Sequence, residues 1–303
     1  MTLTELRYIV TLAQERHFGR AAERCFVSQP TLSIAVKKLE GELGVALFER
    51  SKSAVQLTPV GERVVAQAQK VLEEARAVEE LAHEGRDQLK SPLRLGAIYT
   101  VGPYLFPHLV PRIRDFAPDM PLYLEENFTE VLRGKLRRGE LDAIVIALPF
   151  SEPDVLTRAL FDEPFMLLLP RDHPWADLPQ VAPAEVKETR LLMLGEGHCF
   201  RDQVLESCPG LGTAREGNHL VTEGSSLETI RLMVASGLGA SVVPLSAVEH
   251  MPADGPVQVK PFSAPQPMRT LAIAWRASFP RPKAIDVLID SIRLCQVRAE
   301  GAA

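Results

Sequence analysis

The chain has 303 residues, 46% hydrophobic and 24% charged, which is ordinary for a globular protein and long enough for two or three domains. The sequence contains no apolar run of the roughly 20 residues that a membrane helix needs, and it begins without a signal-peptide pattern. We therefore expect a cytoplasmic protein with no membrane partner. The net charge of −5 is uneven, because residues 1–58 hold eight Lys or Arg against six Asp or Glu. This mildly basic beginning permits phosphate contact at one end of the chain only.

Residues 1–58 predict three short helices followed by two strands. Thr2 and Glu5 have the spacing of a capping box, and apolar residues then recur on one helical face. His17 and the two residues after it break this helix, and a second helix is expected over residues 20–25. Ser28 can cap a third helix, with Pro30 tolerated in its first turn.

The third helix has two distinct faces. Its apolar face, expected to pack in the core, consists of Leu32, Val36, Leu39 and Leu43. Its polar face, which could meet DNA, consists of Gln29, Ser33 and Lys37. Two short strands at about 46–49 and 55–58, with Arg50 and Lys52 near their turn, would form a wing. A small helical domain with a solvated polar face would show the same pattern.

A long helix is predicted from Pro59, with Thr58 as its cap. Small apolar residues then step by three and four to the region of Gly85: Val60, Val64, Ala68, Val71, Ala75, Val78 and Ala82. This seam has the spacing of a coiled coil and predicts dimerisation, although an amphipathic helix lying on its own body would also fit.

The run FGRAAERCFVSQPTLSIAVKKLEGELGVALFERSKSAVQLTPVGE, residues 18–62, resembles the winged helix-turn-helix of the LysR family of transcriptional regulators. The resemblance implies that residues 1–58 form the DNA-binding domain and residues 59–89 the linker and dimerisation helix. It implies contacts to double-stranded DNA through the major-groove residues Gln29, Pro30, Thr31, Ser33 and Lys37 and the backbone-binding Arg50.

From Leu93 the pattern changes to buried strands that alternate with helices. The expected strands are LRLGAI, LYLEEN, DAIVIAL, FMLLLP, RLLMLG and TLAIAW. A helix is expected after Ser225, which forms a capping box with Glu228, and Gly237 suits its end. These alternations predict an α/β body with mostly parallel sheets. The sequence carries neither GxGxxG nor GxxxxGK[ST] and no CxxC pair, so no cofactor and no metal are expected.

The body resembles the two-lobed, periplasmic-binding-protein-like effector domain of the same family. That resemblance implies a regulatory domain over residues 90–303. One lobe would comprise residues 90–161 and 268–303 and the other residues 162–267, with a cleft between them. Thr100 and Thr129 fall at the carboxyl ends of strands, where ligands of such sheets bind.

The stretch GEGHCFRDQVLESC, residues 195–208, contains two of the four cysteines. A helix of about two turns would hold Cys199 and Cys208 about 13 Å apart, whereas a disulfide needs Cα atoms within roughly 7 Å. Oxidation of this pair would therefore require the segment to refold. Peroxide is attacked by a thiolate, which the neighbouring His198 and Arg201 could favour, and a second thiol could then close a disulfide. Both cysteines could equally be small core residues.

The segments GHCFRDQ…C, TVGPYLFPHLVP and LFDEPFMLLLPRDHPWA resemble the peroxide-sensing members of the LysR family. This resemblance implies an activator of oxidative-stress genes in which Cys199 is the peroxidatic and Cys208 the resolving cysteine. It implies that hydrogen peroxide is bound by the residues Thr100, Thr129, His198, Asp202 and Arg269, and that Arg269 and His198 favour the thiolate. Cys25 and Cys295 would be structural.

The same resemblance implies further partners: a second copy of the chain in a dimer, two dimers in a tetramer, RNA polymerase, and a cellular thiol reductant. Two other functions fit parts of the sequence. One is a LysR regulator that binds a small organic effector in the cleft, with both cysteines incidental. The other is a thiol peroxidase, for which the DNA-binding head and the linker have no role.

Overall fold

The computed structural model describes residues 1–50, 55–82, 88–209, 211, 219–222, 226–252 and 254–296. The chain divides into two compact units, Met1–Gly85 and Arg86–Ala303, each with its own core. No helix in these described ranges combines the length and the apolar character that crossing a membrane would require.

The first unit contains three helices, a two-stranded wing and a long helix. Its elements are α1 Leu3–Glu15, α2 Phe18–Arg24, α3 Gln29–Leu43, β1 Phe48–Arg50, β2 Val55–Leu57 and α4 Pro59–Ala82. The expected caps are present: Thr2 and Glu5 form a capping box, and Ser28 accepts a hydrogen bond from the Thr31 amide. His17 is itself the cap of α2, its Nδ1 accepting from the Gly19 and Arg20 amides, so α2 begins earlier than predicted.

The core of the first unit lies between α1, α2, α3 and the first half of α4. Leu32, Val36 and Leu39 are fully buried there, as predicted, but the prediction for Leu43 was wrong, because 38% of its surface is exposed. Leu43 is the last residue of α3, where the helix runs beyond the neighbours that cover its earlier turns.

The predicted seam of α4 divides between two environments. Ala68 is buried in the core of the first unit and Val64 packs against it, whereas Val71 and Val78 are exposed, Val78 to 65%. Their apolar surface is therefore uncovered within a single chain. The turn of the wing with Lys52, and the predicted end of the helix near Gly85, lie outside the described residues.

The second unit holds a mixed sheet in the order β10-β6-β11-β5-β3-β4, with β9 also paired to β6. Its strands are β3 Leu93–Ile98, β4 Leu122–Asn127, β5 Ala143–Ala147, β6 Val155–Pro170, β9 Ser241–Pro244, β10 Val257–Pro261 and β11 Met268–Arg276. A separate parallel pair joins β7 Leu191–Leu194 to β8 His219–Thr222. The remaining elements are α5 Gly102–Phe116, α6 Thr129–Arg137, η1 Pro183–Glu188, α7 Cys199–Ser207, α8 Leu227–Ala235, η3 Leu245–Ala247 and α9 Pro282–Gln296.

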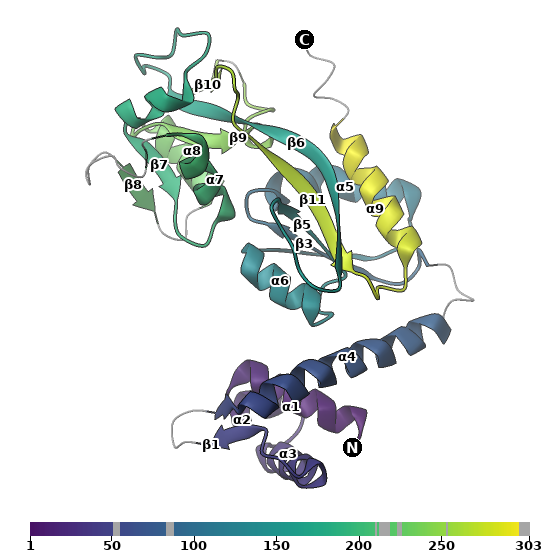
Figure 1. Ribbon diagram of the computed structural model, residues 1–303. Helices are drawn as coiled ribbons and strands as arrows, with labels where there is room; N and C mark the ends of the chain where they lie inside the picture. Colours follow the sequence, from purple (N-terminus) through teal and green to yellow (C-terminus); the bar gives the residue numbers. More distant parts are fainter. Residues whose placement is uncertain are drawn as a thin grey trace. The chain divides into compact units, whose positions relative to one another are not determined.

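All six predicted strands exist, but the expectation of mostly parallel sheets was wrong. Within the described part of this unit, four strand pairings are antiparallel and three are parallel. The long strands β6 and β11 run antiparallel beside each other and connect the two halves of the unit, as Figure 1 shows. A run of buried apolar residues has the same composition in either direction, so the sequence could not reveal this.

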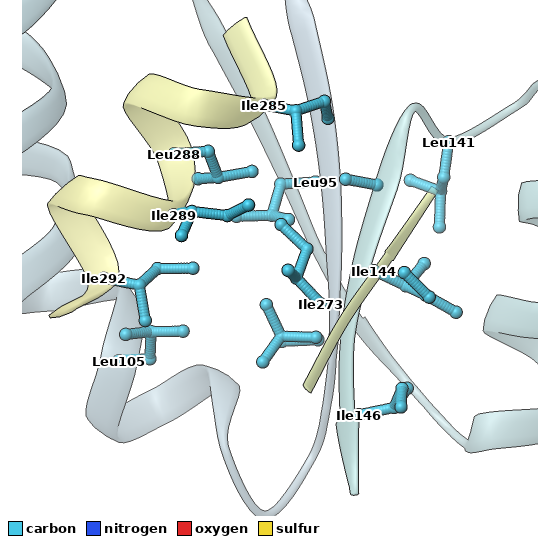
Figure 2. Packing of buried hydrophobic residues seen from close by; sticks show 14 of the residues in the cluster. Leu95, Leu105, Leu141, Ile144, Ile146, Ile273, Ile285, Leu288, Ile289 and Ile292 are labelled. Carbon is cyan, nitrogen blue, oxygen red and sulfur yellow. The ribbon is translucent and has the colours of Figure 1, made fainter. Parts of the chain in front are cut away.

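Two apolar clusters form the core of the second unit. In the first, α9 places Ile285, Leu288, Ile289 and Ile292 against strand residues such as Leu95 and Ile273 (Figure 2). The second cluster lies around β7, α7, α8 and the far half of β6. The expected helix α8 is present, but its cap is Ser226, which accepts from the Thr229 amide, and not Ser225. The two clusters support the proposed division into two lobes, whose boundaries at 161/162 and 267/268 stay a prediction.

Two glycines provide a test of the packing in the first unit. A Cβ on Gly61, in the first turn of α4, would clash with the Leu47 carbonyl oxygen, whereas a Cβ on Gly41, inside α3, would meet nothing within 4 Å. We predict that Gly61→Ala lowers the free energy of unfolding by about 1–3 kcal/mol. Gly41→Ala should raise it by roughly 0.5–1 kcal/mol, because alanine favours the helix. Urea unfolding followed by circular dichroism measures both, and equal stabilities would contradict the close contact at Gly61.

Candidate functional site

The polar face of α3 is open to solvent in the first unit. Gln29, Pro30, Thr31 and Lys37 are exposed and Ser33 is half-buried, so the structure presents all five predicted groove residues on one helix. The sequence analysis missed Ile34, which is 67% exposed on the same helix and could contact a thymine methyl group. Ile34 is three residues from both Thr31 and Lys37, so helical periodicity was the available signal for its place on the polar face. Arg50 ends strand β1.

A small cavity forms where three chain segments of the second unit meet. β3 and β4 are parallel neighbours, so their carboxyl ends bring Thr100 and Thr129 to one edge of the sheet. The turn before α7 adds Gly197, His198 and Cys199. Gly197 adopts φ +91°, and a Cβ there would approach the Phe128 ring to 3.3 Å, so glycine lets this turn close over the site.

The cavity has a free volume of about 10 Å³, which is close to the smallest space that holds one water molecule. The Thr129 Oγ1 is buried and has no hydrogen-bond partner among the described residues. Buried hydroxyl groups are nearly always hydrogen-bonded, so an orphaned one that borders a cavity indicates a small polar ligand.

Thr100 is held in place from behind by Arg269. The Arg269 Nη1 donates to the Thr100 Oγ1 over 2.8 Å, and its Nη2 donates to the Thr100 carbonyl over 3.0 Å. Because the Thr100 oxygen accepts this bond, its own proton can be donated to a molecule in the cavity. Arg269 is buried and does not line the cavity, so the structure puts it one residue behind the predicted peroxide site.

Glu163, which the sequence analysis missed, neutralises Arg269. The two residues are cross-strand partners on β6 and β11, and the Arg269 Nε donates to the Glu163 Oε2 over 2.7 Å. The Glu163 Oε1 accepts from the Ser246 amide over 3.0 Å, and Phe200 lies under the guanidinium at 5.1 Å. The available signal was a pair of carboxylates, Asp162 and Glu163, within the mostly apolar run LFDEPFMLLLP.

His198 caps α7 and is buried in an aromatic environment. Its ring lies 4.8 Å from Phe128 and 5.9 Å from Tyr99, measured between centroids. Burial lowers the pKa of His198 and so favours the neutral ring, which can accept or donate a hydrogen bond. That His198 and Arg269 favour the Cys199 thiolate stays a prediction: burial disfavours the charged form of His198, and Arg269 is paired with Glu163. Cys199 is the first residue of α7, so its thiol lies at the amino-terminal end of this helix.

The two cysteines occupy opposite ends of α7. Cys199 is half-buried and packs against the first apolar cluster, whereas Cys208 is completely buried in the second. Both are free thiols. At about 1.5 Å per helical residue, the helix between them keeps their Cα atoms well beyond the distance of a disulfide.

The structure does not bring Asp202 to the cavity. Its side chain is 69% exposed and lies 3.7 Å from Arg201. Gln203, on the same helix, instead donates to the Leu148 carbonyl over 3.4 Å. In the part of the chain that the structure describes, no three His, Cys, Asp or Glu side chains are grouped to hold a metal ion.

Comparison with known proteins defines the class. Residues 3–62 match the family described as bacterial regulatory helix-turn-helix protein, lysR family, and residues 86–294 match the LysR substrate binding domain. The chain belongs to the LysR family of bacterial regulators.

Three relatives within that family are named OxyR or are OxyR structures. The chain is 41% identical to the DNA-binding transcriptional dual regulator OxyR of Escherichia coli K12, over 97% of this chain and 95% of that protein. Full-length OxyR of Pseudomonas aeruginosa, with a cysteine-to-aspartate substitution, has a similar structure: the TM-score is 0.81 and the identity 68%, covering 98% of this chain and 96% of that one. An H2O2-bound cysteine-to-serine mutant of Corynebacterium glutamicum OxyR gives a TM-score of 0.65 at 31% identity, with 98% and 93% covered.

The burial of Cys208 leads to a prediction about pH. Desolvation raises the pKa of the Cys208 thiol from 9.0 to about 11. The folded chain therefore holds this proton where the unfolded chain releases it, so its contribution to stability is complete below pH 9 and is lost between pH 9 and about 11. The loss should be roughly 3 kcal/mol at most. Urea unfolding of wild type and Cys208→Ala across this range measures it. The difference between them should shrink as the pH rises, and a constant difference would contradict the shift.

Proposed function

We propose that this protein is a transcriptional regulator that senses hydrogen peroxide through Cys199 and Cys208. The Cys199 thiolate attacks one peroxide oxygen, so that an S–O bond forms, the O–O bond breaks, and hydroxide leaves to become water. The Cys208 thiol then attacks the sulfenic sulfur, forming the S–S bond and releasing a second water. A cellular thiol reductant returns both cysteines to thiols.

The unpartnered Thr129 hydroxyl beside Cys199 is the observation that carries this proposal. A donor aimed at the leaving oxygen lowers the barrier to cleavage of the O–O bond, and Thr100 has a proton to donate in the same cavity. Thr100, Thr129 and His198 would contact the peroxide, while Arg269 would act by orienting Thr100. Asp202 is exposed and would not contact the peroxide in this state. The relatives named for hydrogen peroxide point to the same ligand.

The size of the cavity argues against an organic effector at this position. A volume of about 10 Å³ leaves room for a water-sized molecule and not for a metabolite. A regulator that needs a larger effector would need a larger space next to Thr100 and Thr129. We therefore do not place an organic effector in this cavity.

The switch would consist of the refolding of α7. The disulfide cannot form while the helix holds Cys199 and Cys208 apart, so oxidation requires this segment to rearrange. The rearrangement would alter α7 and its neighbours in the second apolar cluster. A covalent bond that is compatible with only one arrangement stabilises that arrangement for as long as it persists.

We also propose how the chain assembles and which partners it binds. The uncovered Val71 and Val78 of α4 would pack against a second copy, pairing two DNA-binding heads on double-stranded DNA, and two dimers would form a tetramer. In the cytoplasm, where it reaches chromosomal DNA, the assembly would direct RNA polymerase to genes of oxidative-stress defence.

We propose a regulator that is not an enzyme. A thiol peroxidase would consume many equivalents of peroxide when a thiol reductant is supplied, whereas a sensor needs one oxidation for each switching event. Multiple-turnover consumption of peroxide by the purified chain with reductant would favour the peroxidase.

The order of the two cysteines is testable. After stoichiometric peroxide, mass spectrometry should find the Cys199–Cys208 disulfide in wild type and a sulfenic acid at Cys199 in Cys208→Ser. Cys199→Ser should slow oxidation at least about a hundredfold, because a hydroxyl is not ionised at neutral pH. Cys25→Ser, in the first unit, is the control and should behave as wild type. If transcription responds to peroxide while Cys199 stays a thiol, the proposed sensor is wrong.

The DNA-binding face is testable in the same way. Gln29→Ala and Ser33→Ala should each weaken specific binding by roughly 1–3 kcal/mol and non-specific binding much less, since base contacts carry specificity. Thr4→Ala, at an exposed position on α1, is the matched control. Titration with operator and with unrelated DNA measures both affinities. Unchanged operator affinity in both α3 variants would rule out this helix as the reader.

A further inference from the structure

A second and much larger cavity lies in the same unit and has no role in the chemistry above. Its volume is about 270 Å³, and it shares no lining residue with the peroxide cavity. Buried Val101, Leu105 and Leu271 supply an apolar floor. An engineered cavity of about 150 Å³ in another protein holds benzene, so this one has room for a ring with a short polar group.

The charges around this cavity favour an anion. Arg112, His108 and His250 line it, and the two imidazole rings lie 5.4 Å apart. Arg112 has no ion pair with any residue that the structure describes. The acidic residues are Glu249 and Glu163, and the charge of Glu163 is balanced by Arg269. The lining therefore offers an anion one guanidinium with no ion pair and two imidazole rings that can donate hydrogen bonds.

A single residue, Arg269, links the lining of the peroxide site to the lining of this cavity. Glu163 and Ser246 both line it and are hydrogen-bonded to each other. Glu163 holds Arg269, and Arg269 holds Thr100, which lines the peroxide cavity. A ligand that displaces Glu163 or the Ser246 turn would therefore change the position of a peroxide donor.

We propose that this second cavity binds a small carboxylic acid with a compact apolar body, and that its occupancy changes the rate at which Cys199 is oxidised. The carboxylate would pair with Arg112 near the two histidines, and the apolar body would lie on Val101, Leu105 and Leu271. The binding half of this proposal stands by itself, and the regulatory half rests on the proposed function.

Calorimetry on the reduced full-length protein tests the binding half with three probes of one shape. Phenylacetate should bind at millimolar concentrations or below, phenylacetamide should bind at least roughly tenfold more weakly, and 2-phenylethylamine should not bind. Arg112→Gln should weaken phenylacetate binding by a similar factor, whereas Arg114→Gln, exposed on the same helix but outside the cavity, should leave it unchanged.

Leu294→Trp identifies the location, because Leu294 lines the cavity and is partly exposed, so the larger ring can fill the space. This variant should abolish phenylacetate binding. The binding half is overturned if phenylacetate fails to bind the wild type, if the amine binds better, or if Arg112→Gln and Leu294→Trp both bind as wild type does.

The regulatory half is read from the rate of Cys199 oxidation, followed by mass spectrometry after quenching. Saturating phenylacetate should change this rate at least roughly threefold in wild type and in Arg114→Gln, and should have no effect in Leu294→Trp. If phenylacetate binds but the rate of Cys199 oxidation is unchanged, the coupling is overturned while the binding site itself stands. Absence of Cys199 oxidation under every condition would instead overturn the proposed function together with the coupling, while calorimetry still decides the site.

Discussion

The buried ion pair between Arg269 and Glu163 fixes the geometry on which the peroxide cavity depends. Removing two charges from water costs several kcal/mol for each ion, and the cost is offset only when the remaining donors and acceptors are also satisfied. Here Arg269 uses the Thr100 hydroxyl and carbonyl, and Glu163 uses the Ser246 amide. One pair thereby ties the end of β3 to β6, β11 and the turn at η3. Loss of either partner would leave a buried charge at this junction, at a cost of about 3–5 kcal/mol.

The helix α7 depends on both apolar clusters at once. Its first residue, Cys199, packs on one cluster, while Phe200, Val204 and Cys208 are buried in the other. Phe200 also contacts both the Arg269 guanidinium and the Phe165 ring. Burial of each large apolar side chain contributes roughly 1.5–3 kcal/mol. The reduced arrangement is thus stabilised by packing, and a disulfide between the helix ends would have to outweigh that packing.

Short-range sequence patterns predicted the fold of the first unit well and that of the second unit less well. The caps at Thr2 and Ser28 and the buried face of α3 follow from short-range hydrogen bonding and helical periodicity, which the sequence states directly. The predicted burial of Leu43 was wrong because helical periodicity does not show where the neighbouring helices end. The prediction of strand direction was wrong because β6 pairs with β11, whose residues lie about a hundred positions away in the sequence. At the site, the strand ends correctly predicted that Thr100 and Thr129 lie together, but the lowered pKa of His198 and the partner Glu163 depend on burial that only the folded chain defines.

The complete burial of Cys208 would make the proposed sensor respond to how long oxidation lasts. After peroxide has reacted at Cys199, the sulfenic acid must wait until local opening of the second cluster delivers the other thiol. The interval between the two oxidation steps would then be set by protein motion, independently of how much peroxide is present. A reductant that reaches Cys199 within that interval would cancel the signal. A brief pulse of oxidant would in this way be erased, and only oxidation that outlasts the opening time would be recorded as a covalent bond.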